Sequence, residues 1–300
     1  MATINEVPFV KGHGTGNDFV VLPDLDGARG ITAEQVRFVC DRHAGIGADG
    51  VLRVVRTEHL DEAVPGIELA EFFMDYRNAD GSLAEMCGNG ARVFVRYLKA
   101  AGHISGSEVV IGTRAGAVTA TMHEDQSITI DMGPAATTGP AEGVIVRANG
   151  REWQATGVLM PNPHAVVFVD DLADAGDLLV APGIQPATAF PDGVNVEFVV
   201  VQGPGHVAMR VHERGVGETR SCGTGACAVA WVARQGGESG RGSAGGEDAS
   251  ARASNAIRVD VPGGTLHVTE MDDGRLLLNG PADLVARGTV LLPDLVHEKQ

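Results

Sequence analysis

Two short stretches of this 300-residue sequence place a cysteine where a glycine-rich turn leads into a helical pattern. Residues 86–92 read MCGNGAR and residues 221–228 read SCGTGACA, and an apolar helical run follows each stretch. A cysteine at a helix N-terminus lies near the positive end of the helix dipole, which lowers its pKa from about 8.5 toward 7. The pattern therefore predicts that Cys87 and Cys222 are usable bases near neutral pH.

The glycines around the two cysteines predict a second use for each turn. They let several backbone N–H groups converge without side-chain obstruction, so each turn could hold an anion such as a carboxylate. A cysteine taken singly is more often a buried structural residue. A buried structural role is less favoured for Cys87 and Cys222, because the same pattern surrounds both. It is favoured for Cys40 and Cys227, which lie among apolar residues within predicted helices.

Two thiols of this kind could invert a stereocentre. One thiolate would remove a proton from a carbon while the opposite thiol returns a proton to the other face. The α-carbon of an amino acid suits this chemistry, because its carboxylate gains charge as the carbanion forms and electrostatic stabilisation then matters most.

The elements that must position these cysteines are mostly strands. Alternating apolar residues predict strands within 51–56, 108–122, 127–133 and 142–160, the last with a hairpin turn at Asn149-Gly150. A helix is predicted from the segment 33–43 with Thr32 as its N-cap, and one helix follows each of the two special cysteines.

The second half of the chain repeats the order of the first half: strands, a Cys-Gly-x-Gly turn, a helix and further strands. Residues 256–292 supply the later strands, with turns at Gly263-Gly264 and Asp273-Gly274. We therefore expect two similar domains with a small-molecule site in the cleft between them. Residues 236–255, rich in Gly, Ser and Ala, are predicted to be a mobile loop.

Composition excludes several classes of partner. The formal charge of −16 and the pI near 4.9 disfavour a nucleic-acid or anionic-membrane surface, and a small-molecule substrate remains. The start of the chain lacks a signal-peptide pattern and no apolar run is long enough to span a membrane, so a cytoplasmic protein with reduced thiols is expected. A homodimer is compatible with these observations.

No cofactor is predicted. The GIGADG stretch at 45–50 follows a helix and precedes a strand, the reverse of the order in a dinucleotide-binding fold. The cysteines and histidines are not spaced as zinc ligands. The only lysines, Lys11, Lys99 and Lys299, lie in a Gly-rich turn, on a predicted helix and in the tail, which disfavours pyridoxal phosphate.

At these residues the sequence resembles the diaminopimelate epimerase family of cofactor-independent amino-acid racemases over nearly the whole chain. Six ordered motifs carry the resemblance: KGHGTGNDF from Lys11, DRHAGIGADG from Asp41, NADGSLAEMCGNGAR from Asn78, PNPHAVVFV from Pro161, GVNVEFV from Gly193 and ERGVGETRSCGTGACA from Glu213.

The resemblance implies an α/β (α+β) fold of two pseudo-symmetric domains. Each domain would be a curved mixed or antiparallel sheet wrapped around a central helix, with the active site in the interdomain cleft. One lobe, with Cys87, would span 1–133 plus 281–300 because the last strand returns to it. The other, with Cys222, would span 134–280 and carry the flexible insertion at 236–255.

The resemblance also implies a function: epimerisation of LL-2,6-diaminopimelate to meso-diaminopimelate, in lysine and cell-wall precursor biosynthesis. Cys87 and Cys222 would be the acid/base pair, with His164 and Glu213 supporting the reacting centre. The implied substrate contacts are Asn17, Asn78, Gly88, Asn89, Asn162, Asn195, Glu213, Arg214, Gly223 and Thr224. No metal is implied.

Two alternatives stay open. A proline or hydroxyproline racemase would share the fold and the paired thiols, but its substrates lack the second ammonium and carboxylate that Glu213 and Arg214 suit. A redox sensor that switches through a Cys87–Cys222 disulfide belongs to a different class, and reversible inactivation by oxidation is expected if the two sulfurs come close.

Overall fold

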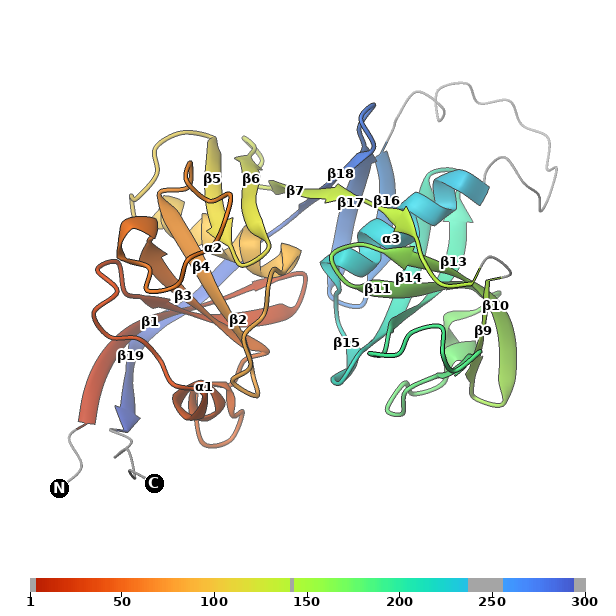
Figure 1. The fold of residues 1–300 in the computed structure, drawn as a ribbon, viewed down its shortest axis with the longest axis horizontal. Coiled ribbons are helices and arrows are strands. Elements are labelled where there is room, and N and C mark those ends of the chain that lie inside the picture. Colours follow the sequence, from red (N-terminus) through yellow and green to blue (C-terminus); the bar gives the residue numbers. More distant parts are fainter. Residues whose placement is uncertain (1–3, 141–142, 237–255, 294–300) are drawn as a thin grey trace. The chain divides into compact units, whose positions relative to one another are not determined.

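The computed structural model describes residues 4–140, 143–236 and 256–293 (Figure 1). The chain divides into two compact units. Unit 1 comprises residues 1–14, 18–128 and 282–300, and unit 2 comprises residues 15–17 and 129–281. Of the loop predicted at 236–255, only Gly236 lies among the described residues, as the last residue of a helix. No helix in the described part of the chain is long and apolar enough to cross a membrane.

Unit 1 is a sheet with two α-helices. Its elements are β1 (Ile4–Gly14), β2 (Asn17–Pro23), α1 (Ala33–Cys40), β3 (Gly50–Arg56), the short 3-10 helix η1 (Thr57–His59), β4 (Phe72–Asn78), α2 (Gly88–Ala100), β5 (Glu108–Thr113), β6 (Gly116–Met122) and β19 (Asp283–Pro293).

In its described residues, unit 2 contains the remaining strands and one α-helix. Its elements are β7 (Ile128–Pro134, whose first residue is the last of unit 1), β8 (Ala136–Thr137), β9 (Val144–Ala148), β10 (Arg151–Leu159), β11 (Pro163–Phe168), the 3-10 helix η2 (Leu172–Ala175), β12 (Gly183–Gln185), β13 (Asn195–Gly203), β14 (His206–Glu213), β15 (Gly217–Thr219), α3 (Gly223–Gly236), β16 (Ala256–Val261), β17 (Gly264–Glu270) and β18 (Arg275–Gly280).

The same pairing pattern occurs in both units. In unit 1, β2 pairs parallel with β3, β3 antiparallel with β4, β4 parallel with β5, and β5 antiparallel with β6. In unit 2, β11, β13, β14, β16 and β17 repeat this series of parallel and antiparallel pairings in order. The repeat that the sequence predicts is therefore present in the strand topology.

Each special helix is the crossover between two parallel strands. Parallel neighbours cannot be joined by a tight turn, and a helix is their usual connection; α2 connects β4 to β5 and α3 connects β14 to β16. Helix α3 contacts β10, β11, β13, β14, β16, β17 and β18. A flat sheet of seven strands would be about 30 Å wide, so the sheet must curve around the helix, as Figure 1 shows.

Burial follows from this arrangement. A helix surrounded by a sheet has no solvent-facing stripe, and nearly every residue of α2 from Gly88 to Leu98 is buried. Helix α1 lies at the surface instead and begins with the predicted cap: Thr32 accepts a hydrogen bond from the Gln35 backbone while the Gln35 side chain accepts from that of Thr32.

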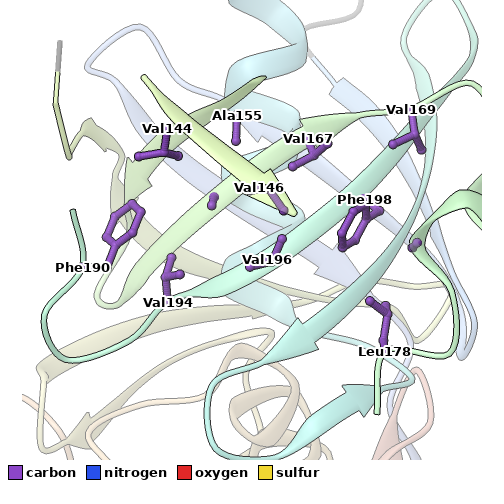
Figure 2. Packing of buried hydrophobic residues seen from close by; sticks show 12 residues of the cluster. Val144, Val146, Ala155, Val167, Val169, Leu178, Phe190, Val194, Val196 and Phe198 are labelled. Carbon is purple, nitrogen blue, oxygen red and sulfur yellow. The ribbon is translucent and has the colours of Figure 1, made fainter. Parts of the chain in front are cut away.

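The other face of the unit 2 sheet carries its own apolar cluster (Figure 2). Side chains point to alternate faces along a strand, so Val196 and Phe198 of β13 lie in this cluster while their neighbours Asn195 and Glu197 point to the α3 side. On β11, Ala165 and every second residue after it face the cluster, whereas His164 faces α3. The alternation thus places polar side chains on the helix side of the sheet.

The predicted turns at Asn149-Gly150 and Asp273-Gly274 lie between paired strands as expected, whereas the turn expected at Gly263-Gly264 lies one residue earlier, at Pro262-Gly263, because Gly264 already pairs with Val261 as the first residue of β17. The Asn149-Gly150 pair joins β9 to β10 with positive φ at both residues, as a type I′ hairpin turn requires. The stretch KGHGTGNDF by itself also predicts a turn, at Asn17 and Asp18, and this position is wrong, because Thr15 (φ 51°) and Gly16 (φ 79°) form the turn. Asn17 and Asp18 instead begin β2.

The last strand pairs with the first. Residues of β19 pair antiparallel with β1 from Ile4 opposite Pro293 to His13 opposite Asp283. This is the strand return that the resemblance implies, and it makes the end of the chain part of the sheet that begins it.

Candidate active site

Cys87 is the N-cap of α2. Its backbone is extended (φ −144°, ψ 119°), and its Sγ accepts a hydrogen bond from the Gly90 N–H at 3.4 Å. Its carbonyl accepts from the Ala91 N–H at 2.8 Å. A sulfur in this position takes the place of the hydroxyl or carboxylate of an ordinary N-cap, which directs it toward the positive end of the helix dipole.

Cys222 makes the same two contacts before α3. Its Sγ accepts from the Gly225 N–H at 3.4 Å and its carbonyl from the Ala226 N–H at 2.9 Å. A further contact at 3.4 Å joins Sγ to the hydroxyl of Thr224. The two Cys-Gly-x-Gly turns therefore have matching geometry at equivalent positions of the repeated topology.

The expectation that both thiol pKa values fall was wrong for Cys222. Burial raises the pKa of the Cys222 thiol well above its usual value, and the charges of Glu213 and Glu197 act in the same direction. Hydrogen bonds from Thr224 and Gly225 oppose this rise without cancelling it. Because Cys222 is only 6% exposed, desolvation outweighs the favourable field of the helix terminus. Near neutral pH Cys222 is therefore a thiol.

The other two cysteines are buried, as predicted. Cys40 is 5% exposed at the end of α1, and burial raises its pKa to about 12. Cys227 is fully buried inside α3. None of the four cysteines forms a disulfide bond.

In unit 1 the turn after Cys87 is supported by a buried arginine. The Arg92 Nη2 donates to the Asn89 Oδ1 at 2.9 Å, and both residues are almost wholly buried. A second contact of 3.5 Å joins the Arg92 Nη1 to the Gly88 carbonyl. The Asn89 side chain is thereby fixed at the first turn of α2, a helix terminus whose dipole favours an anion.

Asn78 and Asn17 are both half-buried. Asn78 ends β4, and its Nδ2 donates to the Ser82 Oγ at 3.0 Å. Asn17 follows a turn that is grouped with unit 2, where the Thr15 and Ser221 hydroxyls are 2.6 Å apart. Within unit 2, Thr15 thus lies against the residue that precedes Cys222.

On the α3 side of the unit 2 sheet, three side chains form a hydrogen-bonded row. The fully buried His164 contacts the Glu197 Oε1 through Nδ1 at 2.7 Å and the Asn162 Oδ1 through Nε2 at 2.9 Å. The parallel register places His164 opposite Asn195 and so two residues from Glu197.

Asn195 connects this row to the segment after β14. Its Oδ1 accepts from the Arg214 backbone N–H at 2.8 Å, and the exposed Arg214 side chain donates through Nη1 to the Asp192 carbonyl at 2.9 Å. Glu213 accepts from the Thr219 hydroxyl. The structure therefore gathers Asn162, His164, Asn195, Glu213, Arg214, Cys222, Gly223 and Thr224 in one unit, and Asn78, Cys87, Gly88 and Asn89 in the other.

Sequence reasoning missed two residues, Glu197 and Arg92. Both are charged, both are fully buried, and each contacts a residue predicted for the site. For Glu197 the available signal was the single charge in the strand pattern VNVEFVVV, whereas Arg92 is one of three cationic residues in the run after Cys87, with Arg96 and Lys99, and nothing local marked it as the buried one. Such a charge is costly to bury without a partner.

Within the described residues, no group of three or more His, Cys, Asp or Glu side chains could hold a metal ion. The chemistry available at the two turns is that of thiols, backbone N–H groups and the polar side chains around them.

Comparison with known proteins adds the family to this geometry. The family model "Diaminopimelate epimerase" matches residues 9–138 and 156–285. Relatives named diaminopimelate epimerase include one from Streptomyces coelicolor, 52% identical over 94% of both chains. Another, from Thermobifida fusca, is 46% identical over 96% of this chain and 99% of its own.

Solved structures share the fold at low identity. A PhzF-family phenazine biosynthesis protein from Bacillus anthracis is 16% identical, with a TM-score of 0.66 over 96% of this chain and 99% of that one. A hydroxyproline epimerase from Agrobacterium vitis is also 16% identical, with a TM-score of 0.63 over 98% and 95%. At this identity the likeness concerns the two-domain α/β fold alone, in which a curved sheet surrounds a helix.

Proposed function

Because the family model and the relatives show that this chain belongs to the diaminopimelate epimerase family, we propose that it interconverts LL-2,6-diaminopimelate and meso-diaminopimelate. In this proposal the protein serves lysine and cell-wall precursor biosynthesis, and its substrate is a small molecule. The observation that best supports the proposal is the matched pair of cysteines, each with a sulfur that accepts the third N–H of the helix it precedes.

The proposed chemistry uses one sulfur for each face of the α-carbon. Because burial keeps the proton on Cys222, Cys87 as thiolate removes the α-proton and Cys222 donates its own to the opposite face. One C–H bond breaks and one forms, and one S–H bond forms as the other breaks. The reverse reaction exchanges the two roles.

Backbone groups would stabilise the carbanion. The N–H groups of Gly88 and Asn89, and those of Gly223 and Thr224, lie at the first turns of α2 and α3, where the helix dipole favours negative charge. The carboxylate of the reacting centre gains charge in the transition state, so these N–H groups stabilise the transition state more than the ground state. His164 and Glu213 support this centre.

The second amino-acid group of the substrate needs its own recognition. Glu213 is suited to the ammonium, Arg214 to the carboxylate, and Asn17, Asn78, Asn162 and Asn195 to further hydrogen bonds. Since the Asn195 side chain is already held by the Arg214 backbone, these two residues would act together in selecting the substrate.

Incubation with LL-diaminopimelate in heavy water tests the proposal. We expect deuterium at one α-carbon as the meso isomer forms, without added pyridoxal phosphate or metal. L-proline and trans-4-hydroxy-L-proline, incubated in parallel, should show no exchange. Exchange on proline without exchange on diaminopimelate would reject the assignment in favour of the proline racemase alternative.

A biosynthetic role also implies a place in the cell. We propose that the protein is cytoplasmic, and expect epimerase activity and the protein itself in the soluble fraction after cells are broken and membranes are removed by centrifugation.

A further inference from the structure

Glu197 is a buried charge that the proposed chemistry does not use. It lies in β13, is fully buried, and points to the α3 side because its neighbours Val196 and Phe198 occupy the apolar cluster on the other face. Its Oε1 contacts His164, whereas its Oε2 is buried without a hydrogen-bond partner among the described residues. Removing a carboxylate from water is costly, so this residue calls for an explanation.

The same carboxylate lies against the Cys222 turn. A Cβ built on Gly225 would be 2.6 Å from the Glu197 Oε1 and 3.3 Å from the Cys222 Sγ. Gly225 also donates the backbone N–H that the sulfur accepts. The carboxylate and the thiol therefore both lie close to the same glycine.

On its other side the carboxylate holds a histidine. A carboxylate acceptor favours the proton on the His164 Nδ1, and in a neutral ring the other nitrogen, Nε2, can then only accept a hydrogen bond. This Nε2 contacts the Asn162 amide at 2.9 Å. An amide can present either its oxygen or its NH₂ group to a neighbour. The state of the His164 ring thus sets which group Asn162 turns outward.

We propose that Glu197 is a positioning residue of this site, which fixes the His164 ring and with it the Asn162 amide, and that its carboxylate places a negative charge beside the Cys222 turn, adding to the effect of burial. The catalytic part of this inference rests on the proposed epimerase function; the effects on His164 and Cys222 do not.

The charged groups around the Cys222 sulfur support this role. The carboxylates acting on it come from two strands packed against α3, Glu213 from β14 and Glu197 from β13, and both raise the pKa of Cys222. His164, on β11, is the titratable neighbour that pairs with Glu197. Replacing Glu197 by a neutral residue should therefore lower the pKa of Cys222.

Two substitutions separate the two effects. Glu197→Gln keeps the length of the side chain and removes its charge, whereas Glu197→Asp keeps the charge and withdraws the oxygen from His164. Glu152→Gln is the matched control, since this exposed β10 carboxylate pairs with Arg147 at the surface. The folding of each variant is compared by thermal unfolding.

The first readout is the pH dependence of Cys222 alkylation by iodoacetamide, followed on the Cys222 peptide by mass spectrometry. In Glu197→Gln the midpoint should move to lower pH, with alkylation below the midpoint about tenfold faster for each unit of pKa. Glu197→Asp, which keeps the charge but moves it, should shift the midpoint less than Glu197→Gln does, and Glu152→Gln should keep the midpoint of the unmodified protein. An unchanged midpoint in folded Glu197→Gln overturns the charge role.

The second readout is the ring N–H signal of His164 in the ¹⁵N-histidine spectrum, assigned with a His164→Gln variant. The signal of a protonated Nδ1 should be present in the unmodified protein and lost in Glu197→Asp. Its persistence there overturns the positioning role, even if Glu197→Gln does not fold.

Turnover is measured last, and kcat should fall by about tenfold or more in both Glu197 variants. If the unmodified protein does not turn over diaminopimelate but the alkylation and histidine results are as expected, the proposed function fails and the role of Glu197 stands. If the unmodified protein turns over diaminopimelate but the Glu197 variants show neither the alkylation effect nor the histidine effect, the role of Glu197 is wrong and the proposed function stands.

Discussion

At the residue scale, the four cysteines differ because their surroundings differ. Cys87 and Cys222 cap helices, whereas Cys40 and Cys227 are packed among apolar side chains. The helix terminus was expected to lower the pKa of Cys222, yet burial and two carboxylates raise it. A sulfur that starts as a thiol is suited to donate a proton, so the correction changes the starting role of Cys222 and not its place in the proposal.

Substitution of the cysteines tests their assignment. Cys87→Ala and Cys222→Ala should each lose at least about three orders of magnitude in kcat, because one face of the α-carbon then lacks its proton carrier, while the thermal unfolding curve stays cooperative. Cys227→Ala, a truncation at a fully buried site, should lower stability slightly and leave kcat near that of the unmodified protein. Full turnover by Cys222→Ala would falsify the two-base assignment.

Cys40 predicts how stability depends on alkaline pH. Its pKa rises from 9.0 to about 12 on folding, so between these values the unfolded chain loses a proton that the folded chain retains. The contribution of the Cys40 thiol to the free energy of unfolding is therefore complete below pH 9. It falls by up to about 4 kcal/mol as pH rises toward 12. Urea unfolding between pH 8 and 11 should show a shallower loss for Cys40→Ala than for the unmodified protein. Equal slopes would contradict a buried, protonated Cys40.

At the element scale, the two turns match in backbone contacts but differ in what surrounds them. At Gly225 an added Cβ would meet the buried Glu197 carboxylate at 2.6 Å, whereas at Gly90 the nearest atom is a terminal methyl of Leu52 at 3.3 Å. Strands β11 and β13 bring polar groups to α3 by simple alternation. The unit 2 turn is therefore the more crowded and more polar of the two.

This difference predicts unequal tolerance of alanine. Gly225→Ala should displace Glu197 or the Cys222 sulfur, lower stability by about 1–3 kcal/mol and reduce kcat strongly. Gly90→Ala, at the equivalent position of α2, requires only a small shift of a flexible side chain and should be clearly milder. Urea unfolding and kcat measured on both variants make the comparison, and similar losses at the two sites would contradict the geometry.

At the scale of the whole chain, the first and last strands form one antiparallel pair. Val290 of β19 is buried opposite Val7 of β1, while Val285 of the same strand is exposed. Residues near the C-terminus thus complete the sheet and the apolar cluster of the unit that carries Cys87.

A charge in the last strand should therefore affect the first. Val290→Asp buries an unpaired carboxylate and should destabilise unit 1 by about 3 kcal/mol or more, with faster amide hydrogen exchange in β1. Val285→Asp should leave β1 protected because its side chain faces solvent. If exchange in β1 is equal in the two variants, β19 does not stabilise that strand as described.

The sequence by itself determined the local structure and the family. Helix starts at Thr32 and Cys87, hairpin turns such as Asn149-Gly150 and the repeated order of elements depend on short-range rules of capping, positive φ and alternation, which one stretch of chain contains in full. Six ordered motifs sufficed for the family. The turn at Thr15-Gly16 was predicted two residues too late, at Asn17-Asp18. Both pairs in the stretch KGHGTGNDF consist of residues that favour turns, so the local sequence does not distinguish them.

The tertiary structure alone decided which groups surround each sulfur. Glu197 reaches Cys222 from a strand 25 positions earlier, and no local pattern reports that parallel β11 and β13 place His164 and Glu197 within a hydrogen bond of each other. A pKa depends on burial and on charges that are near in space, whatever their separation in sequence. For that reason the positions of the thiols could be predicted from the chain, and the protonation state of Cys222 could not.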